Sequence, residues 1–183
     1  MHRNRMHRWG RLLLLHLAAA ALVVGAVAVA EAQSTSRAQS GSGQEAAPTR
    51  GDRLARALPE PLEGQTARER IEDNAETGQV RVQRVYQDAA GKPVIAIVVR
   101  SETPETLKKR KATFMDPEVV RARNGEFREI AGLRFAIMQI QGEYTAFATV
   151  GGRYSVLFFG TPDRTTLLAH IVSTDFGRIG AVP

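Results

Sequence analysis

The spacing of apolar and polar residues divides the chain into three parts. An almost unbroken apolar run extends from Leu12 to Ala30, and residues 33–53 are rich in Ser, Gly, Gln and Ala without any apolar periodicity. A segment of that composition cannot bury enough surface to offset its ordering entropy, so it predicts a flexible linker. From Leu54 onward, apolar residues recur at regular spacing. We therefore expect a leader over residues 1–32, a linker over 33–53 and a single folded domain over 54–183.

Alternation of apolar and polar residues predicts several strands in the folded part. In residues 79–87 Val80 and Val82 alternate with polar side chains, and residues 93–100 are apolar enough for a central strand. The turn between them is expected at residues 88–92. The other predicted strands are residues 126–131, 133–141, 144–150 and 153–160, with the first two either separate or one strand bent at Gly132, and with Gly151-Gly152 as a two-residue hairpin turn.

Helix starts are predicted where a capping residue precedes an apolar stripe. Thr103-Pro104 and Asp116-Pro117 both place an N-cap side chain directly before a proline at the first helical position. Residues 161–163 are expected to cap a last helix, whose buried stripe would be Leu167, Leu168, Ile171 and Val172. Residues 54–62 predict a short helical turn, and residues 66–77 are consistent with a helix that has a thin apolar stripe.

The resulting order of elements is β-β-α-β-β-β-α. Short turns between neighbouring strands make those strands antiparallel. Two amphipathic helices would then cover one face of the sheet. The fold class expected from the sequence is therefore α+β, a two-layer domain with a mostly antiparallel sheet of five or six strands and two helices on one face.

The leader has the layout of a bacterial secretory signal peptide. Four arginines between Arg3 and Arg11 precede the apolar run, and small residues offer cleavage sites after Ala30 and after Ala32. We expect a periplasmic or secreted protein after cleavage. The apolar run is also long enough to cross a bilayer, so an uncleaved N-terminal anchor in the inner membrane is the alternative.

The leader also accounts for most of the positive charge. The whole chain carries a net charge of +6, but residues 1–30 contain four of its 25 basic residues and none of its 19 acidic residues. The remainder has a net charge of about +2. Nucleic-acid binding requires a much larger clustered excess, so we expect no nucleic-acid partner.

Few side chains remain for catalysis or for metal binding. The chain has no cysteine, and His170 is the only histidine after the leader. A zinc site of His and Cys needs three or four such ligands, so neither a metal nor another cofactor is expected. On its predicted helix His170 lies away from the apolar stripe and faces water. Ser173 and Asp175 are too close to it on that helix to converge as a Ser-His-Asp triad.

Two clusters are candidates for binding. The run Lys108, Lys109, Arg110 and Lys111 is a surface basic cluster that points all round a helix, which favours a solvated face or weak contact with a membrane surface or an acidic partner. The aromatic residues of two adjacent strands could line a groove for a small apolar ligand, or could simply pack in the core. These groove candidates are Tyr144, Phe147, Tyr154 and Phe158.

Four short segments carry a resemblance to other proteins. They are residues 58–67 (LPEPLEGQTA), Gly91-Lys92 before an Ile/Val strand, residues 130–134 (IAGLR) and Asp175-Phe176. Through these segments, residues 58–176 resemble a loose family of uncharacterised secreted bacterial α+β proteins, which usually have an aromatic residue in place of Gln65. The domain is more distantly similar to PsbP- and Mog1-type accessory proteins, which are binding modules. The resemblance implies the fold and export, and no mechanism.

These observations favour a non-enzymatic periplasmic binding or accessory domain on a flexible tether. Its partner would be a protein or a small apolar ligand of the envelope. One alternative is a hydrolase whose carboxylates or Ser/Lys pair converge only in three dimensions. The other alternative is a structural component of the envelope. A pocket with buried ionisable groups would favour the enzyme, and a shallow groove or flat sheet face would favour the binding domain.

Overall fold

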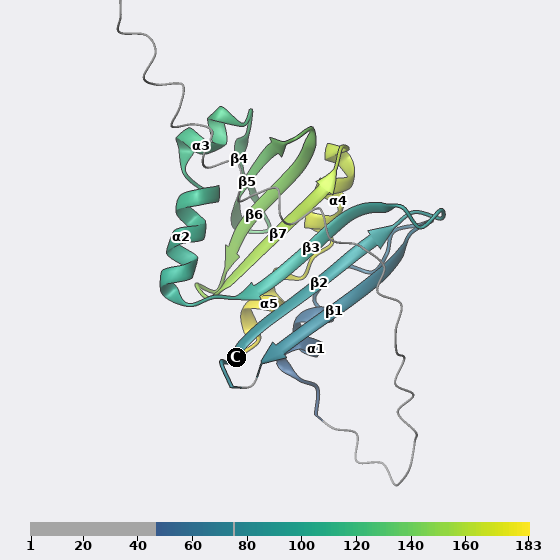
Figure 1. Cartoon of the computed structure of the whole chain (residues 1–183), viewed down its shortest axis with the longest axis vertical. Helices are drawn as coiled ribbons and strands as arrows, with labels where there is room; N and C mark the ends of the chain where they lie inside the picture. The colour runs from purple at the N-terminus through teal and green to yellow at the C-terminus, as the bar shows by residue number, and fades with distance from the viewer. Residues whose placement is uncertain (1–46, 75) are drawn as a thin grey trace, which may run out of the picture. The chain divides into compact units, whose positions relative to one another are not determined.

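A computed structural model describes residues 47–74 and 76–183, which form seven strands and five helices (Figure 1). The strands are β1 (Thr66–Asn74), β2 (Gln79–Gln87), β3 (Pro93–Ser101), β4 (Glu126–Ile130), β5 (Leu133–Ile140), β6 (Glu143–Val150) and β7 (Tyr154–Thr161). The helices are α1 (Arg50–Ala55), α2 (Pro104–Phe114), α3 (Pro117–Ala122), α4 (Arg164–Val172) and α5 (Phe176–Ala181). The predicted leader and residues 33–46 of the predicted linker lie outside the described residues.

All seven strands belong to one sheet, in the order β1-β2-β3-β7-β6-β5-β4, and every neighbouring pair is antiparallel. The expected class, α+β with an antiparallel sheet, is therefore confirmed. The sheet has seven strands and not the expected five or six, because β1 adds a strand at one edge. At the other edge β4 is separate from β5, which is one of the two expected arrangements. Ala131 and Gly132 join β4 to β5 with φ angles of 52° and 73°, the conformation of a two-residue hairpin turn.

The helices cover both faces of the sheet, so the predicted arrangement with two helices on one face is wrong. Side chains alternate between the two faces of a strand. In β5, Phe135 and Ile137 belong to the large core with α1, α4 and α5, whereas Ala136 and Met138 pack with Phe114 and α3. We call the first side the core face and the second side the opposite face.

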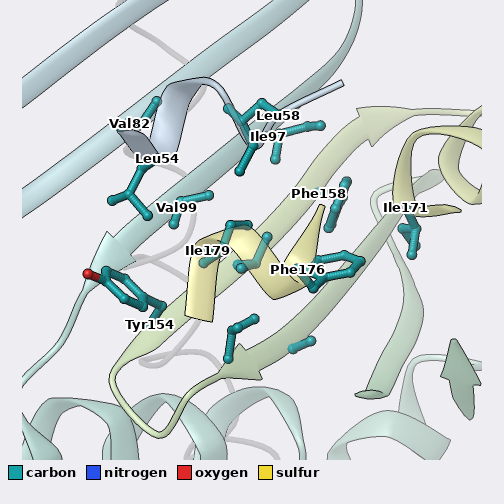
Figure 2. Close-up of a cluster of buried hydrophobic side chains, with 14 of the residues drawn as sticks. Leu54, Leu58, Val82, Ile97, Val99, Tyr154, Phe158, Ile171, Phe176 and Ile179 are labelled. Atoms are coloured by element: carbon teal, nitrogen blue, oxygen red, sulfur yellow. The ribbon is translucent and has the colours of Figure 1, made fainter. Parts of the chain in front are cut away.

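The core face carries most of the buried apolar surface. Figure 2 shows its side chains pointing into the space between the sheet and the helices. They come from α1 and the turn that follows it (Leu54, Leu58), from the strands (Val82, Ile97, Val99, Tyr154, Phe158) and from α4 and α5 (Ile171, Phe176, Ile179). Complete burial of one such aliphatic side chain contributes about 1.5–3 kcal/mol. This layer therefore supplies most of the stability of the domain.

Strand β1 was expected to be part of a helix, and that prediction is wrong. Its only large apolar side chain, Ile71, is 36% exposed, so no apolar alternation marks the strand in the sequence. The strand forms because β2 supplies a hydrogen-bonding edge and opposite charges at paired positions. Glu69 pairs with Arg84, and Glu72 pairs with Arg81.

Helix α1 begins within the predicted linker, at Arg50 rather than near Leu54. Thr49 and Asp52 form a reciprocal capping box, and Gly51 is buried and donates its amide hydrogen bond to Asp73. Arg84 stabilises the other end of the helix, where its guanidinium donates to the carbonyl oxygens of Ala55, Leu58 and Pro59. The packed part of the chain therefore extends back to Thr49.

The starts of α2, α3 and α4 match the predictions from the sequence. Thr103, Asp116, Asp163 and Asp175 are N-caps, and each accepts a hydrogen bond from a backbone N–H of the first helical turn. The connection between β6 and β7 differs slightly from the expected two-residue turn. Val150 pairs with Tyr154, so Gly151, Gly152 and Arg153 form a three-residue loop. No helix among the described residues is long and apolar enough to cross a membrane.

Gly125 lies where the chain passes from α3 into β4, and there is no room for a side chain. A Cβ atom at this position would be 2.6 Å from the carbonyl oxygen of Ile137, 2.8 Å from that of Val120 and 2.9 Å from Cβ of Met138. We expect Gly125→Ala to lower the free energy of unfolding by about 1–3 kcal/mol, as measured by urea denaturation.

Gly177→Ala is the matched control for that substitution. A Cβ atom at Gly177 meets only Oδ1 of Asp175, at 3.4 Å, and alanine is the better helix former in α5. We expect this variant to be as stable as the parent or more so. Equal effects of the two substitutions would contradict the close packing around Gly125.

Candidate functional site

The four aromatic groove candidates do not come together as a groove. Tyr154 and Phe158 are fully buried on the core face, where Phe158 packs edge-on against Phe135 and Phe176. Phe147 lies on the opposite face, stacked on Phe114 of α2 with ring centroids 4.9 Å apart. Tyr144 is half-buried near the start of β6. The alternation of side chains sends Phe147 to the opposite face, whereas Tyr144 packs against the core that contains Tyr154 and Phe158, so these four residues do not line one groove.

A small depression lies beside Tyr144. Asn124, Gly125, Glu126 and Arg164 contribute to its wall, and its volume is about 200 Å³. Pockets for small molecules usually have volumes of about 300–1,000 Å³. Glu126 and Arg164 form an ion pair at this site. The depression is therefore smaller than a usual small-molecule pocket, and its two charged side chains already pair with each other. It is not the best candidate for a functional site.

His170 is fully buried, so the prediction that it faces water is wrong. The inward face of α4 is formed by Leu167, His170, Ile171 and, just past the helix, Thr174, whereas Val172 is 68% exposed. The imidazole can be buried because Nδ1 donates to the carbonyl oxygen of Thr166, at 2.9 Å, and its ring packs edge-on against Tyr86. Ser173 is exposed and the Asp175 carboxylate caps α5, so no triad forms at His170.

The basic run of α2 divides into two kinds of side chain. Lys108, Lys109 and Lys111 are exposed, and Lys109 pairs with Glu105 one turn earlier. Arg110 is half-buried and turns toward the sheet, where its Nε lies 2.5 Å from Oε1 of Glu102. The run does not form one anion site, as expected from its helical spacing. It does supply one arginine to a cluster that the sequence did not indicate.

That cluster lies on the opposite face of the sheet, on the strands β1, β2, β3 and β7. Helix α1 packs against the core side of β1 and β2, and α3 packs against β4 and β5 (Figure 1). On the opposite face of β1 and β2 no described helix lies over the strands. Polar and charged side chains therefore occupy this area of the sheet, which we call the open face.

One transverse row of paired residues runs from the open face on β1 and β2 across β3 to β7, where it becomes buried. Arg81 of β2 pairs with Glu72 on one side and with Arg100 of β3 on the other, and Arg100 in turn pairs with Ser155 of β7. Directly paired residues on neighbouring strands have Cβ atoms about 4.5–5.5 Å apart. The pairing therefore places Arg81 and Arg100 side by side, and Arg110 approaches them from α2. We call Arg81, Arg100 and Arg110 the arginine cluster.

Two members of the cluster are held by partners within the chain. Arg81 donates from Nη2 to Oε1 of Gln83, at 2.7 Å, and its Nη1 lies 3.5 Å from Glu72. Arg110 pairs with Glu102, whose carboxylate also accepts a hydrogen bond of 2.7 Å from the hydroxyl of Ser155. The Glu102 side chain is only 6% exposed. Its carboxylate is therefore committed to Arg110 and Ser155.

The Nε atoms of Arg81 and Arg100 are both buried without a hydrogen-bond partner, but Arg100 differs from Arg81 because its guanidinium makes no hydrogen bond or ion pair with any described residue. Burial lowers the pKa of Arg100 below its ordinary value, and the adjacent Arg110 and Arg81 lower it further, against the opposing effects of Glu102 and Glu72. The lowered pKa means that the charged form of Arg100 is disfavoured where it stands. A half-buried arginine between two others is typical of a site that receives an anion.

The net charge of the groups around Arg100 also favours anion binding. Arg70 pairs with the same Glu72 carboxylate as Arg81, so four guanidinium groups share the two carboxylates of Glu72 and Glu102. The group has a net charge of +2. Guanidinium groups bind carboxylate and phosphate oxygens with two parallel hydrogen bonds. This arrangement can bind an anion.

Sequence reasoning missed Arg81 and Arg100, although a signal was present. Each of them follows a buried valine in a predicted strand. Because side chains alternate between the two faces of a strand, both arginines are expected to point away from the core. The register of the hairpin through residues 88–92 then decides that they pair. The sequence did not provide that register, and a shift of one residue in it would separate Arg81 from Arg100.

Comparisons with family models, with curated proteins and with solved structures found no match to this chain. Among residues 47–74 and 76–183, no group of three His, Asp or Glu side chains is placed to hold a metal ion.

Proposed function

We propose that this protein is a non-enzymatic binding or accessory domain of the bacterial envelope, and that it binds its partner through the open face. The observation that carries the proposal is Arg100, a half-buried arginine without a partner among the described residues and flanked by Arg81 and Arg110. A desolvated charge next to like charges reduces stability. Its presence is explained when a bound partner supplies the missing negative charge.

The location in the envelope rests on the leader. Residues 1–32 have the layout of a secretory signal peptide, and cleavage after Ala30 or Ala32 would release the domain into the periplasm. The folded part would then start at Thr49, after a short polar stretch. An uncleaved leader would instead keep the domain beside the membrane. In both cases the open face is available to envelope components.

The experiment that tests this function is crosslinking in intact cells. The chain with its own N-terminus is expressed as the parent, as an Arg81→Gln/Arg100→Gln double variant and as Arg128→Gln. Arg128 is an exposed residue of β4 at the far edge of the sheet, so its substitution controls for the loss of charge. Circular dichroism and thermal unfolding of each purified protein check that it is folded.

We expect the parent and Arg128→Gln to be crosslinked to the same envelope component, and the double variant to lose that product. Crosslinking that survives in the double variant would contradict binding through the open face. Recovery of the protein from the cytoplasm with an intact N-terminus would contradict the envelope location.

A further inference from the structure

We propose that the arginine cluster binds a phosphate group carrying two negative charges, in the form of a phosphomonoester or of inorganic phosphate. This inference rests on the proposed function, because it names the chemistry that the open face recognises. It goes beyond that function in assigning the ligand class and the residues that bind it. The argument depends on the number of free donors, on the net charge and on the positions of the fixed groups.

The donors of the cluster fit the oxygens of a phosphate group. A carboxylate is planar, has two oxygens and carries one negative charge, and a single guanidinium fork binds both oxygens. Here Arg81 and Arg100 lie side by side in the β2–β3 pairing, and the guanidinium of Arg100 makes no hydrogen bond with any described residue. A phosphate group has three or four oxygens that accept hydrogen bonds from several directions at once. Two neighbouring guanidinium groups therefore match a phosphate better than a single carboxylate.

The charge also matches. Four guanidinium groups and two carboxylates leave the cluster with a net charge of +2. A phosphomonoester carries a charge of about −1.5 to −2 at neutral pH. Binding would neutralise the cluster and would remove the repulsion that Arg81 and Arg110 exert on Arg100.

The chain holds the outer two arginines in place before any ligand arrives. Gln83 and Glu72 orient Arg81, and Glu102, itself fixed by Ser155, orients Arg110. Glu102 acts on Arg100 only through its charge and makes no hydrogen bond or ion pair with it, because its carboxylate is held by Arg110 and Ser155. Arg100 is therefore the residue left to make the principal contact with the phosphate.

The test measures binding of inorganic phosphate, with acetate as the carboxylate probe, by isothermal titration calorimetry at constant ionic strength. The protein is the chain with its own N-terminus, purified from the bacterial envelope. Arg100→Gln removes the charge, and Arg100→Lys keeps the charge but removes the planar fork. Arg128→Gln is the control. Sedimentation with vesicles of phosphatidylcholine, with or without phosphatidic acid, tests whether a lipid carries the phosphate group.

We expect the parent and Arg128→Gln to bind phosphate with the same affinity and to bind acetate much more weakly. Arg100→Gln and Arg100→Lys should each lose at least about tenfold in affinity while remaining as stable as the parent or more so. Sedimentation with phosphatidic acid vesicles that depends on Arg100, together with weak binding of free phosphate, would support the proposal and assign a lipid as the source.

Three results would overturn the proposal. They are equal phosphate affinity of Arg100→Gln and the parent, acetate bound as tightly as phosphate, and no binding by the parent to phosphate or to phosphatidic acid vesicles. These outcomes are separate from a failure of the proposed function. Crosslinking that depends on Arg81 and Arg100 without phosphate binding would leave the open face as the binding surface and exclude only the ligand class.

Discussion

Substitution of Ile171 by aspartate is expected to unfold the domain. Ile171 lies on the inward face of α4, is fully buried and packs in the large core together with Phe158 and Phe176. Removal of a buried aliphatic side chain costs about 2–5 kcal/mol, and an unpaired carboxylate in the same place adds the cost of desolvation. The sum is comparable to the whole stability of a domain, about 5–15 kcal/mol. Far-ultraviolet circular dichroism and urea denaturation measure the effect.

Val172→Asp provides the matched control, since it introduces the same side chain one position later in the same helix. Val172 is 68% exposed. Its substitution should change the free energy of unfolding by no more than about 0.5 kcal/mol. A folded Ile171→Asp protein, or a Val172→Asp protein that is equally damaged, would show that α4 is rotated from the orientation described above.

These two positions illustrate what local pattern predicts and what it does not. The apolar residues Leu167, Leu168, Ile171 and Val172 define an average direction on α4 that lies away from the true inward face. His170 belongs to that face because the carbonyl of Thr166 and the ring of Tyr86 provide an environment for a neutral imidazole. The second of these partners is remote in sequence. The existence of α4 and its cap at Asp163 followed from local residues, whereas its rotation depended on tertiary contacts.

The same distinction holds for the sheet. Strand β2 has the predicted bounds, residues 79–87, because valines mark its buried side. Strand β1 has no such mark, and it exists because β2 offers an edge and complementary charges. The coverage of both faces by helices was missed for a related reason. Phe114 at the end of α2 and Met115 just after it pack on the opposite face, and no local feature of the sequence says which face of the sheet they meet.

The candidate site was the part least accessible from the sequence. The basic run on α2 was visible as four consecutive charges, yet only Arg110 takes part in the cluster. The other two arginines are far apart in sequence, with Arg81 near the start of β2 and Arg100 near the end of β3. They become neighbours through the β2–β3 pairing, and their significance depends on which carboxylates are already engaged elsewhere. Neither fact can be obtained from residue spacing alone.

His170 should make the stability of the domain depend on pH below neutrality. Burial lowers the pKa of His170 below its ordinary value of 6.5, and the hydrogen bond from Nδ1–H to Thr166 opposes this effect only in part. The carbonyl of Thr166 can only accept, so the proton of the neutral ring is on Nδ1. Nε2 has no partner among the described residues. The facing Tyr86 is neutral, because burial raises its pKa to about 12.

The direction of this dependence follows from linkage between protonation and folding. Below about pH 6.5 the unfolded chain binds a proton at His170 that the folded domain does not bind. The free energy of unfolding therefore decreases as the pH falls from 7 through 6.5. Below the pKa of His170 in the folded state, protonation of this residue causes no further decrease. Asp52 and Asp163, whose hydrogen bonds with Thr49 and Thr166 lower their pKa values below 3.8, contribute only at lower pH. The two effects are thus separated along the pH axis.

Two substitutions of His170 distinguish its packing from its titration. We expect His170→Ala to lower the free energy of unfolding at pH 7.5 by about 2–4 kcal/mol, because it leaves a cavity beside Tyr86. His170→Leu fills most of that space with a group that cannot be protonated, so it should remove the decrease in stability between about pH 7 and 5. Urea denaturation at several pH values measures both quantities. An unchanged stability in His170→Ala, or the same pH dependence in His170→Leu as in the parent, would mean that the imidazole is solvated.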